Sequence, residues 1–304
     1  MVKCLFQPVN IASLVFFRIV FGILGFADVL NICIYYHWTV NAFGPDQFRF
    51  RYYGFEWVRP FPEPFMSFFF LTLCGLALLI MLGKWYRISS LLFALGFTYV
   101  FLLEKAHYLN HGYLFCWVGF VMAFLPAHRQ FSADVLRRPA LRSDTIPYWC
   151  LFLLQFLMGV VYFYGGIAKL NADWLNATPL KQWLEQKVDV PIIGPLLEWE
   201  GVACFMAYGG LLLDLTVVFF LFFHKTRPWA FAGVLFFHFA NHLIFNIGIF
   251  PFLSVALTAL YFPPDFPVRV YKKLKGRLPF LERVNRWWAK HTAAGQLSEV
   301  PLWQ

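Results

Sequence analysis

The sequence has few charged residues, because Asp, Glu, Lys and Arg together make up 13% of its 304 residues. A water-soluble domain carries about twice that share, which excludes the soluble globular class. Hydrophobic residues make up 60% of the chain, aromatic residues 21%, and the mean hydropathy is +0.61. These values are typical of a protein that crosses a membrane several times.

Acidic residues are scarcer than basic ones, at 16 against 25, and the net charge is +9. The basic residues lie between apolar runs instead of forming one patch, and the aromatic residues are typical of membrane interfaces. Nucleic acid is therefore not an expected partner.

The six cysteines include no close pair with metal-ligand spacing, and we expect them to behave as small hydrophobic residues. The chain also lacks internal repeats, low-complexity linkers and a secretory signal. Its first apolar run carries Arg18 and Asp28 and has no small-residue cleavage pattern, so we expect that run to remain as a membrane anchor.

Apolar runs of spanning length predict an all-α, polytopic membrane helical bundle with about eight transmembrane spans. A bundle over residues 1–263 is expected, followed by a basic, partly amphipathic tail over 264–304 on the cytoplasmic side, where Trp287 and Trp288 suggest an interfacial helix. The predicted spans are 11–31, 64–83, 87–104, 111–126, 147–168, 203–223, 229–246 and 249–263.

The basic residues indicate the orientation of this bundle, since cytoplasmic loops near the spans carry most Lys and Arg. With a cytoplasmic N-terminus, most of the basic residues fall on the cytoplasmic side. The opposite side holds Arg49, Arg51, Arg59, Lys105, Lys169, Lys181 and Lys187.

Lys169 is the first charged residue after an uncharged stretch from Ile146 to Ala168. A stretch of that length spans a bilayer, so this amine is expected where hydrocarbon meets headgroups, behind two glycines. Partial dehydration disfavours the charged form and makes the amine a candidate general base or nucleophile. The structural interpretation is a lysine that reaches toward the interface.

Three polar segments, one of which contains Lys169, are predicted to converge on the non-cytoplasmic side, where intramembrane polar residues indicate function. A base, histidine donors, amides and aromatic walls in a lipid-accessible pocket suit proton transfer on an amphipathic substrate. The candidate pocket residues are Asn110, Tyr113, Tyr162, Trp174, His238, Asn241 and His242, beside the candidate catalytic residues Lys169 and His111.

Each of these residues also has a structural interpretation. His111 could be an interfacial histidine, and His238 and His242 share one helix face and could hydrogen-bond within the bundle. Asp214 lies near mid-membrane and must be protonated, paired with a cation such as Arg18, or hydrogen-bonded to catalytic groups. We favour a structural role for Asp214 and Arg18.

The sequence resembles the membrane domain of the vitamin K-dependent gamma-carboxylases, also called the horizontally transferred transmembrane (HTTM) domain, almost from end to end. The resemblance is carried by Phe16-Phe-Arg18, Tyr99-Val-Phe-Leu-Leu-Glu-Lys105, Asn110-His111-Gly-Tyr-Leu, Ala168-Lys169-Leu-Asn-Ala-Asp-Trp174, Gly209-Gly-Leu-Leu-Leu-Asp214 and Phe237-His238.

This resemblance implies that Lys169 deprotonates vitamin K hydroquinone, which then consumes O2, ends as the epoxide, and generates a strong base for carboxylation of a glutamyl polypeptide with CO2. His111 is implied to stabilise the carbanion side of the chemistry, and no metal is implied. We expect the protein in the endoplasmic reticulum membrane or the bacterial inner membrane, with the active site toward the non-cytoplasmic face.

The sequence departs from the family in ending at Gln304 without the C-terminal lumenal domain that docks the polypeptide substrate, and in carrying Ala168 and Asn171 beside the lysine. Tethering supplies effective concentration, so epoxidation is expected to be more secure than carboxylation here. A separate partner could supply the docking.

Two other functions remain open. One is a non-catalytic quinone- or lipid-binding membrane protein, which does not need the missing domain. The other is a di-metal membrane oxygenase, because His107 with His111 and His238 with His242 are two HxxxH pairs resembling the histidine boxes of desaturases.

Overall fold

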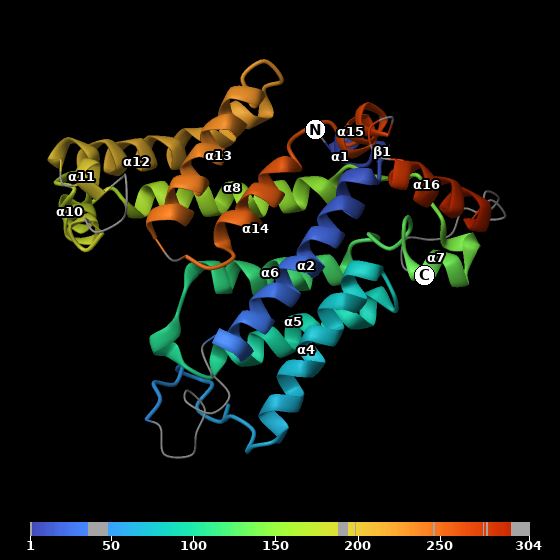
Figure 1. The fold of residues 1–304 in the computed structure, drawn as a ribbon, viewed down its shortest axis with the longest axis horizontal. Helices are drawn as coiled ribbons and strands as arrows, with labels where there is room; N and C mark the ends of the chain where they lie inside the picture. The colour runs from blue at the N-terminus through green and yellow to red at the C-terminus, as the bar shows by residue number, and fades with distance from the viewer. Residues whose placement is uncertain are drawn as a thin grey trace. The chain divides into compact units, whose positions relative to one another are not determined.

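The computed structural model describes residues 2–35, 48–187, 194–197, 199–245, 247–275, 277 and 279–292. These residues form two compact units (Figure 1). The first contains the described residues up to Leu154 and those from Pro263 onward, and the second runs from Gln155 to Phe262. The boundary falls inside one long helix, α8 (Trp149–Ala168).

All eight segments predicted to span the membrane contain a helix, which confirms the all-α fold. Each helix lies largely within its predicted segment. The reason is that the polar or turn residues that end an apolar run also end the helix. These helices are α2 (Ala12–Tyr35), α4 (Phe65–Leu82), α5 (Tyr86–Leu102), α6 (Asn110–Phe124), α8, α12 (Glu200–Phe222), α13 (Arg227–Ile244) and α14 (Phe250–Ala259).

Four of these helices are long and apolar enough to cross a membrane by length and composition, namely α2, α4, α8 and α12. The apolar helices α5 and α14 are shorter. The 10 residues of α14 rise about 15 Å, roughly half of a hydrocarbon core. The number of eight spans therefore stays a prediction, whereas the helices themselves are present.

In the first unit, α2 packs along α4, and α5 packs between α4 and α6. The approach of α2 to α4 is close, because a Cβ at Gly22 would lie 2.6 Å from the backbone nitrogen of Met81. The core beside this contact is aromatic. The ring of Phe21 stacks on Phe115 at 4.7 Å and meets Phe93 edge-on at 6.2 Å.

Arg18 is fully buried in α2, where an unsatisfied guanidinium would be very costly. Its two terminal nitrogens donate hydrogen bonds to the carbonyl oxygens of Ala127, Gln130 and Phe131. The side chain thereby fastens the second turn of α2 to the segment that follows α6. The structural role expected for Arg18 stays a prediction.

Several short elements gather at one end of the first unit: α1 (Val2–Leu5), β1 (Pro8–Asn10), α7 (Ala133–Arg137), η2 (Pro139–Leu141) and β2 (Thr145–Pro147). The two strands pair antiparallel, with Val9 opposite Ile146. The carboxylate of Asp134 accepts hydrogen bonds from the backbone of Trp85 and Tyr86, where α5 begins. The backbone nitrogen of Asp134 donates to the carbonyl of Gly83, where α4 ends.

The start of α2, the end of α4 and the starts of α5 and α8 thus lie at one end of the first unit. We call it the basic end, because it carries Arg129, Arg137, Arg138 and Arg142. The helices of the first unit therefore alternate in direction. Which side of a membrane this end faces stays a prediction.

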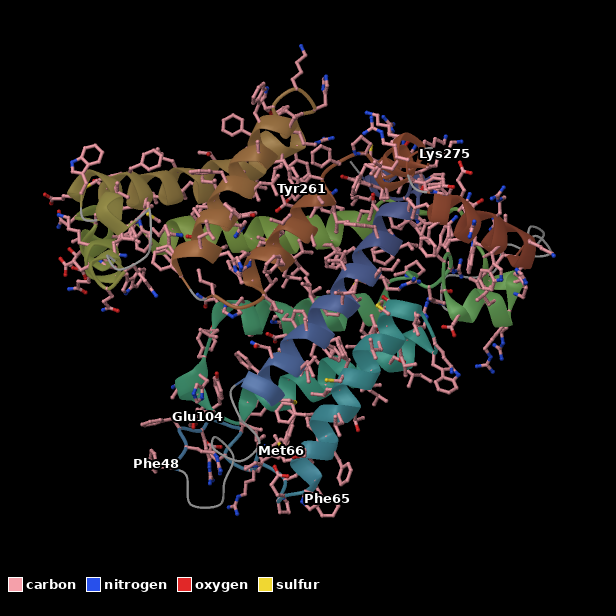
Figure 2. The ribbon with its side chains drawn as sticks, in the orientation of Figure 1. Phe48, Phe65, Met66, Glu104, Tyr261 and Lys275 are labelled. Atoms are coloured by element: carbon pink, nitrogen blue, oxygen red, sulfur yellow. The ribbon has the colours of Figure 1, made fainter. Side chains whose placement is uncertain are left out.

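The opposite end of the first unit contains the segment 48–64, η1 (Lys105–His107) and the start of α6, and Figure 2 shows Phe48 and Glu104 there. The Glu104 carboxylate accepts hydrogen bonds from the backbone of Phe50 at 3.1 Å and Ala106 at 2.8 Å. The hydroxyl of Tyr99 donates to the carbonyl of Arg59 at 2.7 Å.

Two further helices, α15 (Phe266–Leu274) and α16 (Pro279–Thr292), belong to the first unit. Helix α15 packs on α2, where the rings of Phe16 and Phe266 meet edge-on at 5.5 Å. The predicted tail over 264–304 is helical in these parts, and residues 293–304 lie outside the described ranges. Its separation from a bundle over 1–263 stays a prediction.

The second unit is built from α8 beyond Gln155, α9 (Ala172–Leu175), α10 (Thr178–Glu185), α11 (Gly194–Leu197), α12, α13 and α14. Helix α13 packs on both α12 and α14. Gln155 joins α8 to the end of α14, since its amide donates to the carbonyl of Leu260 and its own carbonyl accepts from the Tyr261 hydroxyl. An apolar cluster including Leu180, Leu184 and Ala207 holds α10 against α12.

Candidate active site

Lys169 directly follows α8 and forms an ion pair with the carboxylate of Asp214 in α12. The two side chains expose 18% and 8% of their surface, so both partners are largely withdrawn from solvent. The ammonium also lies 3.4 Å from the carbonyl oxygen of Gly165, one turn earlier in α8. Charges withdrawn from water in this way need such a partner.

The two glycines before Lys169 allow α8 to approach α12 at Asp214. A Cβ on Gly166 would lie 2.7 Å from the side chain of Leu215 and 3.0 Å from its backbone nitrogen. A Cβ on Gly165 would lie 3.3 Å from the Asp214 carboxylate. Larger residues at these positions would push the carboxylate away from the amine.

The ring of Trp174 covers the ammonium of Lys169, which lies 5.2 Å from the ring centroid. Asn171 forms the N-cap of the short helix α9, and its side-chain oxygen accepts from the backbone of Trp174 at 3.0 Å. The indole nitrogen of Trp174 donates to the carbonyl of Ala207 at 2.9 Å. The ring is therefore held from both sides, and the contact is of the cation–π kind.

A second polar cluster links α8, α13 and α14. The hydroxyl of Tyr162 lies 3.0 Å from Nε2 of His238 and 3.1 Å from the hydroxyl of Thr258, which donates to the carbonyl of Ser254 at 2.7 Å. Tyr162 and Lys169 are seven residues apart, which places them on one face of α8 about 10 Å apart along the axis.

His238 is 2% exposed and is flanked by the rings of Phe237 and Phe250 at 5.3 and 5.6 Å. Its Nδ1 atom has no hydrogen-bond partner among the described residues. A buried polar atom without a partner is costly, so it marks a place where a polar group of a ligand would be stabilised.

Most of the predicted pocket residues of the second unit thus fall into two clusters along α8, each of which also includes residues of other helices. Lys169 and Trp174 form one with Asp214, and Tyr162 and His238 form the other. Asn241 is half-buried on α13, and His242 is exposed beside the ring of Phe252 at 5.0 Å. His238 and His242 therefore do not share one environment, although they are one turn apart.

The remaining predicted site residues, Asn110, His111 and Tyr113, lie in the first unit at the start of α6. The ring of Tyr113 is half exposed and contacts those of Phe101 and Trp117 at 6.1 Å each. His111 is partly buried. Convergence of these residues with Lys169 stays a prediction.

Sequence reasoning did not single out Thr258 and did not recognise Asp214 as the partner of Lys169. A lone threonine in an apolar helix carries little signal, although leaving a buried hydroxyl without a partner is costly. Of the alternatives considered for Asp214, the structure shows both pairing with a cation and a hydrogen bond from a candidate catalytic residue, because the cation is Lys169. Arg18 instead bonds to backbone carbonyls.

Among the described residues, no three His, Cys, Asp or Glu side chains gather in a group that could hold a metal ion. In α13, His238 is buried and His242 is exposed, so this HxxxH pair does not present two imidazoles to one point. The polar groups of the candidate site are the ion pair of Lys169 with Asp214 and the buried imidazole of His238.

Fold and site define an all-α membrane protein whose intramembrane polar groups include a lysine–carboxylate pair. The chain belongs to the HTTM domain family, whose family model matches residues 6–266. HTTM domains occur in vitamin K-dependent carboxylases, in agreement with the resemblance seen in the sequence. No solved structure matches the chain significantly.

Proposed function

We propose that the protein is an integral membrane enzyme of the vitamin K-dependent gamma-carboxylase type, in which Lys169 takes a proton from vitamin K hydroquinone. The observation that supports this proposal is the Lys169–Asp214 ion pair, sheltered by Trp174. The carboxylate beside the amine is a place that can receive its proton.

The pair provides that place internally. Transfer of one proton from the ammonium to the carboxylate breaks an N–H bond, forms an O–H bond, and leaves a neutral amine beside a neutral acid. Separated charges are disfavoured in a dehydrated site, so the neutral form becomes accessible there. The free amine then accepts the hydroxyl proton of the quinol as a general base.

Other residues position the quinol. Trp174 limits the access of water to the amine, and its indole plane suits stacking with a flat ring. The unpartnered Nδ1 of His238 is suited to hydrogen-bond a second polar group of the ligand. Tyr162 fixes the imidazole through the contact at Nε2. Tyr113, Asn110, Asn241 and His242 complete the proposed list of pocket residues.

Vitamin K hydroquinone, once deprotonated, supplies with O2 the strong base that removes the γ-proton of glutamate before CO2 adds. In this proposal His111 donates a hydrogen bond to the developing negative charge. The glutamyl polypeptide is the second substrate, and a separate partner can present it. The active site faces the non-cytoplasmic side of an endoplasmic reticulum or bacterial inner membrane.

The test incubates the reconstituted full-length protein with reduced vitamin K, bicarbonate and a free glutamyl peptide, and measures epoxide and carboxylated peptide separately. Lys169→Ala should lower epoxide formation by about 10²–10⁴-fold, the range that general base catalysis supplies. The matched control is Lys181→Ala, which removes another lysine of the same unit from its pair with Glu200. That variant should keep wild-type activity.

Measuring the epoxide and the carboxylated peptide separately distinguishes the possible functions. Epoxide without carboxylated peptide would assign the chain the first half-reaction and point to a missing docking partner. Wild-type protein that binds the quinol but forms no epoxide would contradict the enzyme and favour a quinone-binding membrane protein. Lys169→Ala with unchanged epoxide formation would contradict the assignment of the base.

A further inference from the structure

Helix α16 has three distinct faces at the basic end of the first unit. One face is buried: Trp288 stacks on Phe131 with ring centroids 4.8 Å apart, and Thr292 is fully enclosed. At 100° per residue, Phe280, Val284 and Trp287 form a neighbouring stripe, and Arg283, Arg286 and Lys290 form a third. The last two stripes are exposed.

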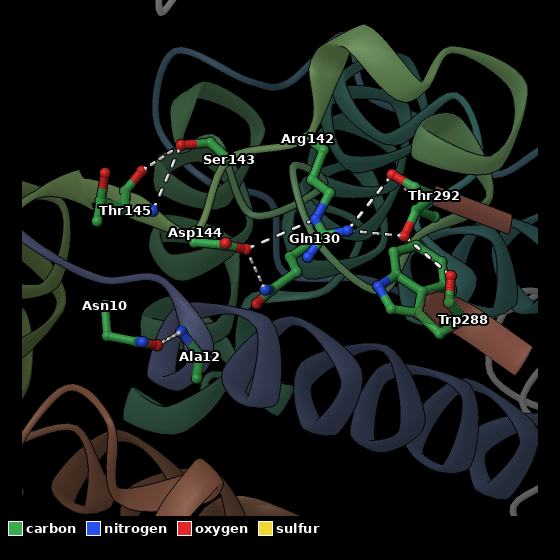
Figure 3. A network of polar contacts seen from close by, with 9 residues as sticks. All are labelled: Asn10, Ala12, Gln130, Arg142, Ser143, Asp144, Thr145, Trp288 and Thr292. Carbon is green, nitrogen blue, oxygen red and sulfur yellow. Dashed lines mark hydrogen bonds and ion pairs between the residues drawn. The ribbon is translucent and has the colours of Figure 1, made fainter. Parts of the chain in front are cut away.

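The buried face fixes how α16 is turned. Arg142 donates hydrogen bonds to the backbone carbonyl and the hydroxyl of Thr292 in the last turn, as Figure 3 shows. The same guanidinium lies 3.6 Å from the carboxylate of Asp144, which accepts a hydrogen bond from Gln130. Because α16 is held at its last turn and by Trp288, its apolar stripe cannot turn inward.

The apolar stripe is large for a surface that water covers. Phe280 is 71% exposed, Trp287 51% and Val284 38%. Successive members are four and three residues apart, which is the spacing of one continuous helix face. An exposed apolar patch bordered by charge indicates a surface that binds something.

The charge beside that stripe indicates what binds. Arg283, Arg286 and Lys290 lie on its flank, and none of them takes part in the ion pairs found among the described residues. Helix α15 adds Lys272 and Lys273, and Lys275 directly follows it. All three are exposed, and Figure 2 shows Lys275 at this end of the unit. The complementary partner is a surface rich in negative charge.

The position of α16 selects a membrane over a protein as that surface. Helix α16 packs on α7, whose Asp134 joins the end of α4 to the start of α5. Helices that cross a bilayer end where its headgroups lie. An amphipathic helix fixed at this level, with Trp on the apolar side and Lys and Arg beside it, matches the interfacial arrangement.

We propose that α16 binds the surface of the surrounding bilayer, with Phe280, Val284 and Trp287 inserted among the lipids and Arg283, Arg286 and Lys290 bound to anionic headgroups. This binding anchors the basic end to membranes that contain anionic lipid and is independent of the proposed enzymatic reaction.

The test uses the full-length protein in lipid nanodiscs, with Cys4 replaced by Ser and a nitroxide attached at Val284→Cys. The matched control carries the label at Asn285→Cys, one residue along the helix and outside the apolar stripe. Electron paramagnetic resonance measures the ratio of relaxation by O2, which enriches in lipid, to relaxation by a polar nickel complex. The nanodiscs contain phosphatidylcholine alone or phosphatidylcholine mixed with phosphatidylglycerol. The variant Cys4→Ser, without an added cysteine, gives the background signal from the other native cysteines.

In discs with phosphatidylglycerol the ratio should exceed one at position 284 and fall below one at position 285. In phosphatidylcholine alone, after Arg283→Gln, Arg286→Gln and Lys290→Gln together, or at high salt, position 284 should fall below one, because screening and charge removal weaken the attraction. Gel filtration and thermal unfolding confirm that each variant is folded.

Three results would overturn the proposal. A ratio below one at position 284 in every disc means that the stripe faces water. Low relaxation by both reagents means that protein covers the stripe, for example a second copy of the chain. A ratio above one at position 284 that changes neither with lipid charge nor with the Gln substitutions would contradict the proposed binding to anionic headgroups.

Discussion

At the scale of single residues, the proposed chemistry depends on which of two groups, Lys169 or Asp214, holds one proton. Both groups are withdrawn from solvent, and together they carry no net charge in either protonation arrangement. An isolated lysine at the same depth would lack this balance. The carboxylate is therefore as much a part of the proposed base as the amine.

Replacing Asp214 by Asn should lower epoxide formation by about 10²-fold, the lower end of what an acid–base group supplies. The amide cannot accept the proton that the amine must lose before it can act as the base. Epoxide formation by the reconstituted variant and the wild type, measured at one pH, checks this.

The matched control for that variant is Asp173→Asn, which removes an exposed carboxylate that is close to Lys169 in sequence. It should leave the rate of epoxide formation unchanged. A wild-type rate in Asp214→Asn would restrict Asp214 to a structural role, as sequence reasoning alone had favoured.

His128 makes the stability of the basic end depend on pH. The side chain lies outside the spans, is 4% exposed and stacks on Tyr86 at 5.3 Å. Burial, with Arg87, Arg129 and Arg18 nearby, lowers the pKa of His128 from 6.5 to about 4, although Asp134 acts in the opposite direction. The unfolded chain therefore binds the proton more readily than the folded one.

Stability should consequently be constant above about pH 6.5 and decrease as the pH falls toward the folded pKa, by a few kcal/mol in total, at about 1.4 kcal/mol per unit. Thermal unfolding measured between neutral and acidic pH checks this. His128→Gln should be less dependent on pH over that window, whereas His291→Gln, which removes an exposed histidine, should behave like the wild type.

At the scale of elements, the close approach of α8 and α12 brings the two charged groups together. Gly166→Ala places a methyl group 2.7 Å from the side chain of Leu215. Overpacking of this kind costs about 1–3 kcal/mol. The melting temperature should fall and epoxide formation with it, because α12 must move away from Lys169.

The control on the neighbouring helix is Gly209→Ala, where nothing lies within 4 Å of the added Cβ. Removing a glycine from a helix without a clash stabilises by about 0.5–1 kcal/mol. Equal melting temperatures for the two variants would mean that the contact at Gly166 does not set the spacing of the helices.

Most of the helices could be predicted from the sequence. A long apolar run between charged or turn residues is stable in a membrane as an α-helix, because a helix satisfies its own backbone hydrogen bonds. The prediction of a span over 249–263 was too long, since α14 ends at Ala259 and Tyr261 then bonds to Gln155. That ending depends on a partner more than a hundred residues away, which local patterns do not contain.

The site was accessible only in part. The uncharged run before Lys169 and the glycine pair identified the amine and the close approach, and Tyr162 and His238 lie together as polar residues in apolar helices often do. The pairing with Asp214 was not readable, because nothing in the spacing distinguishes Lys169 from Arg18 as its cation. Choosing between them requires the packing of α8 on α12.

At the scale of the whole molecule, the basic residues predict which helix ends share a side of the membrane. Ala140 lies in η2 at the basic end, and Tyr53 lies in the segment at the opposite end, where it is 97% exposed. Single cysteines at these positions, in protein with Cys4 replaced by Ser, should react with an impermeant maleimide from opposite sides of sealed vesicles. Ala140→Cys should react from the cytoplasmic side. Labelling of both from one side would contradict the alternation of spans.

The Lys169–Asp214 pair also bears on how the chain is built. Helix α8 leaves the ribosome before α12, so the amine is already in place when the helix bearing the carboxylate enters the translocon. An acidic residue near the centre of an inserting helix opposes insertion by about 2.5–3.5 kcal/mol, and a waiting counter-charge offsets that barrier. Loss of Lys169 would therefore affect biogenesis as well as turnover, and low abundance in cells would be the first sign of it.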